Sequence, residues 1–164
     1  MNIRLETMTK EMYRAYLQEF ILDISLFADP TAYKPYVYNQ AKCDDTFDRY
    51  VSLGRVHFII MVDSEAAGEV ILKKINYEEK HCTLGISMKT DAWKGKGYGT
   101  AAEILALRYA FETMNMDTVY ADALENNTRS QHVLKKVGFR ETHTDDMFRY
   151  YRCDRKNWKE KQNI

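Results

Sequence analysis

The sequence of 164 residues predicts a single layered domain, spanning 1–164, of the α/β (α+β) class around a mixed β-sheet. Two observations predict this class. Strand-like runs at 55–63, 68–76 and 81–89 are separated only by short turns, which is typical of an antiparallel meander. A strand, a helix and another strand then follow one another over 81–124, which is the pattern of a parallel crossover. One sheet should therefore contain both antiparallel and parallel neighbours.

The N-terminal third is expected to supply one strand and two helices. Residues 2–7 alternate between apolar and polar side chains and predict the first strand. Apolar side chains recur at helical spacing over 9–20 and predict the first helix. A second helix is expected around 43–53, with Asp44 or Asp45 near its start.

The remaining elements follow the meander in a regular order. They are a largely buried helix that runs from the glycine-rich stretch to about Met114, a strand at 117–124, a helix at 127–138 that ends at Gly138, and an antiparallel pair at 139–143 and 147–154. The charged segment at 154–164 is expected to be a frayed tail.

Composition excludes several classes of protein. Basic and acidic side chains number 24 each, and this zero net charge argues against a nucleic-acid-binding protein. The N-terminus has no apolar core of signal-peptide length, and no apolar run approaches the ~20 residues of a membrane span. We therefore expect a cytoplasmic protein with no membrane partner. Cys43, Cys82 and Cys153 lie far apart, which predicts reduced thiols and no metal site.

The stretch "WKGKGYGTAA" at 93–102 opens the long apolar helix with glycine at every second position. A helix N-terminus offers unpaired N–H groups and a partial positive charge, and glycines let an anion approach the backbone. Lys94 and Lys96 add formal charge, so a diphosphate is the expected ligand. The motifs of dinucleotide and nucleoside-triphosphate loops are absent. A plain glycine-rich turn is the alternative, but ordering each glycine costs ~0.5–1 kcal/mol.

The sequence from 84 to 139 resembles the GNAT superfamily of acyl-CoA-dependent N-acyltransferases. "KGKGYG" at 94–99 matches the family's loop signature, except that Lys94 stands where glutamine or arginine is usual. "NTRSQHVLKKVGF" at 127–139 resembles its second motif, and residues 1–83 carry no specific motif. The resemblance implies a mostly antiparallel sheet of six to seven strands flanked by about four helices. The branch that it suggests contains ribosomal-protein N-terminal and spermidine acetyltransferases.

The resemblance implies acetyl-CoA as co-substrate, with no metal. The backbones of Met88 and Thr90 would then contact the pantetheine arm. Asn127 and Ser130 are further candidates for this contact, although Asn127 could be a plain N-cap. The backbone amides that should hold the diphosphate are those of Lys94, Gly95, Lys96, Gly97, Tyr98, Gly99 and Thr100.

Both catalytic groups that are usual in relatives are missing. Thr83 occupies the position of a glutamate base and Leu134 that of a tyrosine acid. An alkylamine has a pKa near ~10.4, so a base is still required. The substitutes considered are Glu69, His81, Tyr150 and Tyr151. We select Glu69, working through water, as the base and Tyr150 as the acid; the alternative is that Glu69 is an exposed strand carboxylate and His81 a solvated histidine.

The acceptor is only broadly defined by the sequence. Acids and tyrosines gather within 21–54, which suits a cationic amine but equally fits a solvated helix face with core tyrosines. The function predicted is transfer of an acetyl group to a primary amine, either a small cationic amine or a peptide N-terminus. The alternative is a non-catalytic acyl-CoA sensor on the same fold, and a homodimer is left open.

Overall fold

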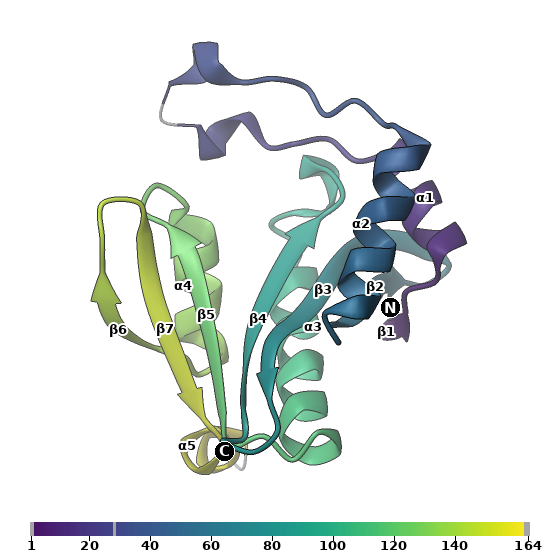
Figure 1. Cartoon of the computed structure of the whole chain (residues 1–164). Coiled ribbons are helices and arrows are strands. Elements are labelled where there is room, and N and C mark those ends of the chain that lie inside the picture. Colours follow the sequence, from purple (N-terminus) through teal and green to yellow (C-terminus); the bar gives the residue numbers. More distant parts are fainter. Residues whose placement is uncertain (1, 28, 163–164) are drawn as a thin grey trace.

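One seven-stranded sheet, in the order β1-β2-β3-β4-β5-β7-β6, forms the centre of the protein (Figure 1). The structure is a computed structural model that describes residues 2–27 and 29–162. The strands are β1 (Ile3–Thr7), β2 (Val56–Val62), β3 (Glu65–Asn76), β4 (His81–Met88), β5 (Thr118–Leu124), β6 (Arg140–Thr144) and β7 (Phe148–Asp154). Only β4 and β5 pair in parallel, and all other neighbours are antiparallel. The predicted mixed sheet, its meander and its parallel step are confirmed.

Helices cover both faces of this sheet. They are α1 (Lys10–Gln18), α2 (Gln40–Ser52), α3 (Tyr98–Arg108), which continues as a π-helical turn at Tyr109–Thr113, α4 (Thr128–Val137) and α5 (Arg155–Gln162). Helices α1 and α2 lie on one face, where a cluster of buried residues joins them to Ile59 of β2. Helices α3, α4 and α5 lie on the other face over the larger core.

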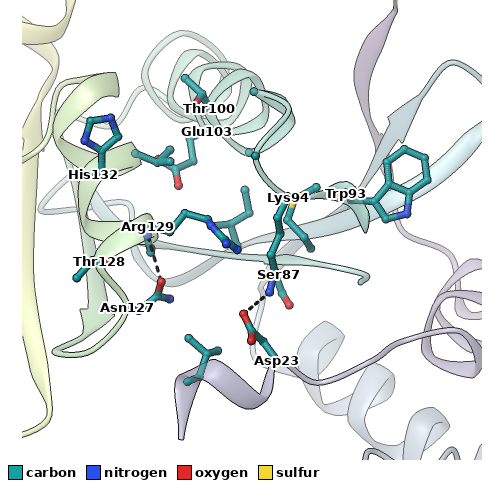
Figure 2. Close-up of a pocket in the computed structure, with 18 of the residues that line it drawn as sticks. Asp23, Ser87, Trp93, Lys94, Thr100, Glu103, Asn127, Thr128, Arg129 and His132 are labelled. Atoms are coloured by element: carbon teal, nitrogen blue, oxygen red, sulfur yellow. Dashed lines mark hydrogen bonds and ion pairs between the residues drawn. The ribbon is translucent and has the colours of Figure 1, made fainter. Parts of the chain in front are cut away.

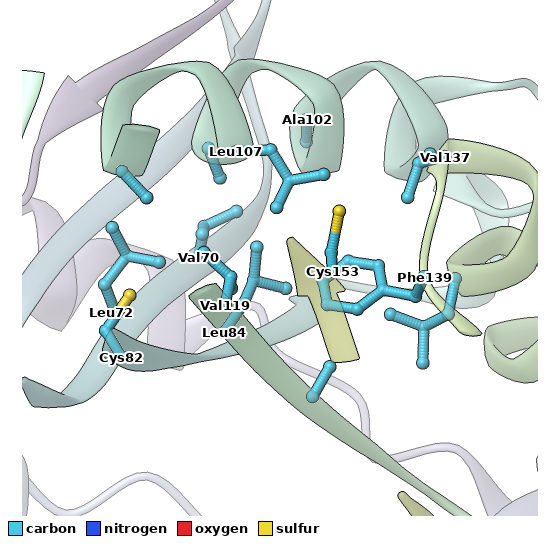
Figure 3. Packing of buried hydrophobic residues seen from close by; sticks show 14 of the residues in the cluster. Val70, Leu72, Cys82, Leu84, Ala102, Leu107, Val119, Val137, Phe139 and Cys153 are labelled. Atoms are coloured by element: carbon cyan, nitrogen blue, oxygen red, sulfur yellow. The ribbon is translucent and has the colours of Figure 1, made fainter. Parts of the chain in front are cut away.

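The larger core explains why α3 is apolar on most of its surface. Ala102, Ala106 and Leu107 are fully buried against strand residues such as Val70 and Val119 (Figure 3). Small alanines let the helix approach the sheet closely, and branched side chains from the strands fill the space between them. This packing fixes the N-terminus of α3 relative to β4.

Strands β4 and β5 separate after four paired residues. Their parallel ladder runs only from His81 to Leu84 on β4, opposite Thr118 to Ala121 on β5. Beyond Leu84 the two strands diverge into a V (Figure 1). Backbone groups on this side of β4 therefore lack a neighbouring strand, although β3 still pairs with β4 as far as Met88.

Two boundaries differ from those predicted. Helix α2 begins at Gln40 because the Asn39 side chain, not Asp44 or Asp45, caps it by accepting from the Lys42 amide at 3.0 Å. Strand β3 begins at Glu65 because the preceding turn is tight. Asp63 in that turn has a φ of 53°, a conformation that suits two-residue hairpin turns.

The C-terminal segment is also different, because the expected frayed tail is instead the helix α5. Trp158 on this helix is only 3% exposed and packs against Phe111, with 5.4 Å between the ring centroids. Burial of this large aromatic side chain stabilises the helix, and the Arg155 amide adds a hydrogen bond of 2.9 Å to the Asp117 carbonyl. None of the helices in the described part of the chain has both the length and the apolar character needed to cross a membrane.

Candidate active site

The glycine-rich stretch forms the turn that leads into α3. Gly95 and Gly97 adopt φ values of 73° and 83°, in the left-handed region where residues with a Cβ are strained. Gly97 is the residue before α3, and no side chain among the described residues caps this helix. The first bond of the helix joins the Ala101 amide to the Gly97 carbonyl at 3.0 Å. The amides of Tyr98, Gly99 and Thr100 therefore precede the intrahelical ladder and remain available.

A cavity of about 580 Å³ opens at the start of α3 and is lined there by Gly99 and Thr100 (Figure 2). This volume lies in the range of small-molecule binding sites. Of the residues predicted to bind the cofactor, those that line the cavity are Met88, Lys94, Gly95, Gly97, Gly99, Thr100, Asn127 and Ser130. Thr90, Lys96 and Tyr98 do not line it. Lys96 is exposed and Tyr98 packs on Trp93.

Strand β4 forms one wall of the cavity through Ile86, Ser87 and Met88. The Lys89 amide donates to the Ala67 carbonyl on β3 at 2.8 Å. Because successive residues in a strand direct their backbone groups to alternate sides, those of Met88 point toward the V between β4 and β5. This geometry agrees with a backbone contact from Met88. The Thr90 carbonyl already accepts from the Trp93 amide at 3.2 Å.

Helix α4 forms the opposite wall, and its start is held in two ways. The Asn127 side chain caps it by accepting from the Ser130 amide at 3.1 Å. The buried Gln131 side chain donates to the carbonyls of Leu124 and Glu125 at 2.8 and 2.9 Å, which ties the helix to the end of β5. The N-cap alternative for Asn127 is therefore confirmed, and the residue lines the cavity as well.

Lys94 is less available than the sequence suggested. Its ammonium group forms a short ion pair with Asp23 and another, of 2.7 Å, with Asp91, and its amide donates to the Asp91 carbonyl at 3.0 Å. Figure 2 shows Asp23 and Lys94 meeting at one side of the cavity. Burial alone would raise the pKa of Asp23, but hydrogen bonds from Lys94 and Ser25 outweigh it and lower the pKa to about 2. The positive charge of Lys94 is thus offset by two carboxylates.

Comparison with known proteins gives the same family as the resemblance of the glycine-rich loop. Residues 3–140 match the model of the family described as the acetyltransferase (GNAT) domain. The chain belongs to the GNAT acetyltransferase family. The fold expected from the resemblance is thereby confirmed.

Individual proteins are similar to this chain in sequence or in fold. Spermidine N(1)-acetyltransferase of Escherichia coli (strain K12) is 29% identical over 96 residues, which are 58% of this chain and 51% of that protein. The chain thus spans about half the length of the curated relatives that it matches. Among solved structures, the spermidine N-acetyltransferase of Vibrio cholerae in complex with CoA and spermine superimposes with a TM-score of 0.77 at 16% identity, over 95% of this chain and 97% of that one. Apo FdhC, a nucleotide-linked sugar GNAT, also gives 0.77, at 17% identity over 98% and 91%.

The resemblance placed Thr83 at the position of a glutamate base and Leu134 at that of a tyrosine acid, and these placements stay predictions. Leu134 is 2% exposed and contributes to the core. The substitute Glu69 lies on β3 beneath α1 and α2, and its carboxylate is 2.6 Å from His57 Nε2. Glu69 does not line the cavity, but its partner across the β3–β4 ladder is Ser87, which does.

The side chain of the second substitute, Tyr150, contacts Asp145 and His143 and not the cavity. Its hydroxyl donates to Asp145 Oδ2 at 2.7 Å, and its ring stacks on His143 with 4.4 Å between centroids. The hydrogen bond to Asp145, with burial and nearby negative charge, raises the pKa of this phenol. The residue lies outside the lining of the cavity. The predicted roles of Glu69 and Tyr150 stay predictions.

Several lining residues were not identified from the sequence. Arg129 and His132 extend from α4, and Asp23 comes from the connection between α1 and α2. Glu103 lines the cavity from α3, and its position on a mostly apolar helix was the available signal. A charged residue on a helix surface has many ordinary explanations, so spacing alone did not distinguish Arg129 from its neighbours. Among the described residues no cluster of three or more His, Cys, Asp or Glu is arranged to hold a metal ion.

Proposed function

We propose that this chain is an N-acetyltransferase that moves an acetyl group from acetyl-CoA to a primary amine, and that its acceptor is a polyamine-type cation. The observation that carries the proposal is the cavity in front of the uncapped N-terminus of α3. The family match supports the reaction class, and the spermidine acetyltransferases among the relatives support the acceptor class.

The residues around the cavity fit the co-substrate. A Cβ added at Gly95, Gly97 or Gly99 would meet no heavy atom within 4 Å, so open space lies directly against the backbone there. The amides of Tyr98, Gly99 and Thr100 would hold the diphosphate, as expected for an anion at a helix N-terminus. The pantetheine arm would lie along Met88, with Asn127 and Ser130 opposite. When bound, acetyl-CoA supplies an activated acyl group and a thiol leaving group.

Glu69 is proposed as the base that takes the proton of the attacking amine through water. Its support is the register with Ser87, since directly opposed side chains on neighbouring strands lie about 5 Å apart on one face of the sheet. The side chain of Glu69 is 15% exposed, and its 2.6 Å hydrogen bond with His57 Nε2 orients it. A short water chain would connect this carboxylate to the lining of the cavity and carry the proton.

The acceptor proposal has support from charge as well as from relatives. A second cavity of about 200 Å³ lies beside the first, where β4 and β5 diverge, and its two charged lining residues are the exposed Asp122 and the half-buried Lys73. Ile86, Asn127 and Ser130 line both cavities. A cationic amine that enters through the smaller cavity would thus reach the larger one past a negative charge.

The test is amine-dependent release of the coenzyme A thiol. Purified protein is incubated with acetyl-CoA and, separately, with spermidine, spermine or a short peptide with a free N-terminus. We expect thiol release with the polyamines at rates above that with the peptide. Release with the peptide alone would contradict the polyamine assignment. Tight binding of acetyl-CoA without release on any amine would favour the alternative function, a non-catalytic acyl-CoA sensor.

The base is tested with a pair of matched variants. Glu69→Gln should lower kcat/KM by about 10²-fold or more and flatten its rise with pH, because a general base contributes roughly 10²–10⁴-fold. Glu78→Gln, on the exposed turn between β3 and β4, should leave both unchanged. Equal pH profiles for the two variants would remove Glu69 from the mechanism.

A further inference from the structure

Glu103 is the one buried acidic side chain among the described residues that line the main cavity. It is 1% exposed, and its Oε2 atom has no hydrogen-bond partner in the described part of the chain. Glu103 and Arg129 extend into the cavity from the two facing helices, α3 and α4 (Figure 2). A buried polar atom without a partner costs about 1–3 kcal/mol, so its position on the wall of a ligand cavity requires an explanation.

The surroundings of Glu103 favour its neutral form. The charged or titratable side chains that share the cavity are Arg129, His132, Lys136, Lys94 and Asp23. The three from α4 are exposed, and Lys94 is paired with Asp23 and Asp91. Strand β4 contributes only neutral residues to the cavity. Strand β1, which also packs on α3, presents Ile3 and Leu5 to the same core. Burial without a compensating cation raises the pKa of Glu103 to about 8.

We propose that Glu103 is a coenzyme-binding residue whose protonated carboxyl group donates a hydrogen bond to an acceptor oxygen of the bound acyl-CoA. This inference rests on the proposed function. A protonated carboxyl has one O–H donor, whereas an ionised carboxylate only accepts. The diphosphate oxygens and the amide carbonyls of the pantetheine arm are acceptors of the matching kind. An ionised Glu103 would instead place a negative charge near the diphosphate.

The proposal predicts a pH-dependent affinity. Binding requires the protonated form, so affinity is retained below the pKa of Glu103 and decreases as pH rises through it. We expect the dissociation constant of acetyl-CoA, measured by calorimetry between pH 7 and pH 9.5, to rise toward tenfold per pH unit at the upper end. This range lies above the secondary pKa of a phosphate group, near ~6, so the ligand itself contributes little change.

Two variants distinguish the effect of the Glu103 carboxyl group on binding from other effects of pH on the protein. Glu103→Gln keeps a donor that cannot ionise, so its dissociation constant should lie within about threefold of wild type at pH 7 and stay flat to pH 9.5. Glu112→Gln removes an exposed carboxylate from the π-helical turn after α3 and should follow the wild-type curve. If Glu103→Gln does not fold, ¹³C-carboxyl NMR of the wild type with and without CoA gives a separate answer, because binding should raise the pKa of one buried glutamate.

The possible outcomes are distinguishable. A wild-type affinity that is constant over this range, or one that falls equally in Glu103→Gln, overturns the inference and leaves the proposed function standing. Absence of any acetyl-CoA binding overturns both.

Discussion

The three glycines of the loop have two different physical roles. Gly95 and Gly97 are required by the backbone, because their positive φ values would strain any residue with a Cβ. Gly99 lies within α3 in ordinary helical conformation, and a Cβ there would project into open space. The fold alone does not need glycine at this position, so under the proposed function Gly99 would leave room for the ligand.

Replacement of Gly99 by alanine should change stability and affinity in opposite directions. We expect the free energy of unfolding to rise by about 0.5 kcal/mol, because alanine is the better helix former. The dissociation constant of CoA should rise about tenfold, because the added methyl group occupies the diphosphate position. Urea unfolding and calorimetry measure the two quantities.

Gly97→Ala is the matched comparison. It adds the same methyl group next to the same cavity, but its φ of 83° should cost roughly 1–2 kcal/mol of stability. If Gly99→Ala binds CoA as tightly as the wild type, the diphosphate does not lie against the start of α3.

At this scale the sequence predicted the binding loop better than the walls around it. Glycine spacing has a direct backbone meaning, and five of the seven predicted loop residues line the cavity. Met88, Asn127 and Ser130, which the family resemblance implied, line it as well. Glu103 and Arg129 reach it only because α3 and α4 face each other, which no local pattern encodes. The catalytic candidates were chosen by strand order, and strand order does not determine which face a side chain occupies until the register is known.

Among the elements, the connection between α1 and α2 is held over the cavity by contacts that join distant parts of the chain. Figure 1 shows this connection crossing above the open end of the V. The Ile21 amide donates to the Lys89 carbonyl at 3.0 Å, and the Asn126 side chain donates to the Leu26 carbonyl at 3.0 Å. Asp23 adds its ion pair with Lys94.

Loss of the Asp23 charge should loosen this connection. Hydrogen bonds from Lys94 and Ser25, acting against burial, lower the pKa of Asp23 to about 2. The stabilisation is therefore present above the usual pKa of 3.8 and is lost only as pH falls toward 2. Asp23→Asn should speed hydrogen exchange over 19–27 by several-fold at neutral pH, as measured by mass spectrometry.

Asp91→Asn is the control for this prediction, because Asp91 also pairs with Lys94 but its side chain is 73% exposed. An exposed ion pair contributes little, so its loss should leave exchange near the wild-type rate. Equal exchange in both variants would show that the Asp23 ion pair does not hold the connection.

The close approach of β3 to β4 depends on Gly68. A Cβ at this position would lie 2.5 Å from the Ser87 carbonyl oxygen and 3.2 Å from the Met88 Cα. Gly68→Ala should therefore displace the end of β4 that forms the cavity wall, lower the free energy of unfolding by about 1–3 kcal/mol and weaken CoA binding. Gly85→Ala on β4 adds the same group where the nearest atom is 4.0 Å away, and should cost less than 1 kcal/mol. Thermal unfolding measures the stability of the two variants, and calorimetry measures their affinity for CoA.

The order of the elements was predictable and some of their ends were not. Apolar runs in the sequence indicate strands, so the predictions of the meander and of the parallel step were correct. Helix α2 was placed three residues late because any of Asn39, Asp44 and Asp45 can cap a helix, and only packing selects one. Helix α5 was missed because a single tryptophan in a charged segment gives no periodic signal.

For the whole molecule, α5 closes one end of the larger core. Trp158 is 3% exposed and lies against Phe111. Trp158→Ala should lower the free energy of unfolding by about 3–5 kcal/mol, which is the usual cost of deleting a buried aromatic side chain. Trp158→Phe should cost much less, since the indole Nε1 has no partner among the described residues. Denaturant unfolding followed by circular dichroism compares them, and a small loss in Trp158→Ala would mean that α5 is dispensable.

The short parallel ladder has a mechanical consequence. Strands β1 to β4 lie on one side of it and β5 to β7 on the other, so the first and last strands of the chain belong to different halves of the sheet. The two halves are joined within the sheet only through the pairing of His81–Leu84 with Thr118–Ala121. Tension applied to the two ends would load this seam before the longer antiparallel ladders, so the sheet should tear there first.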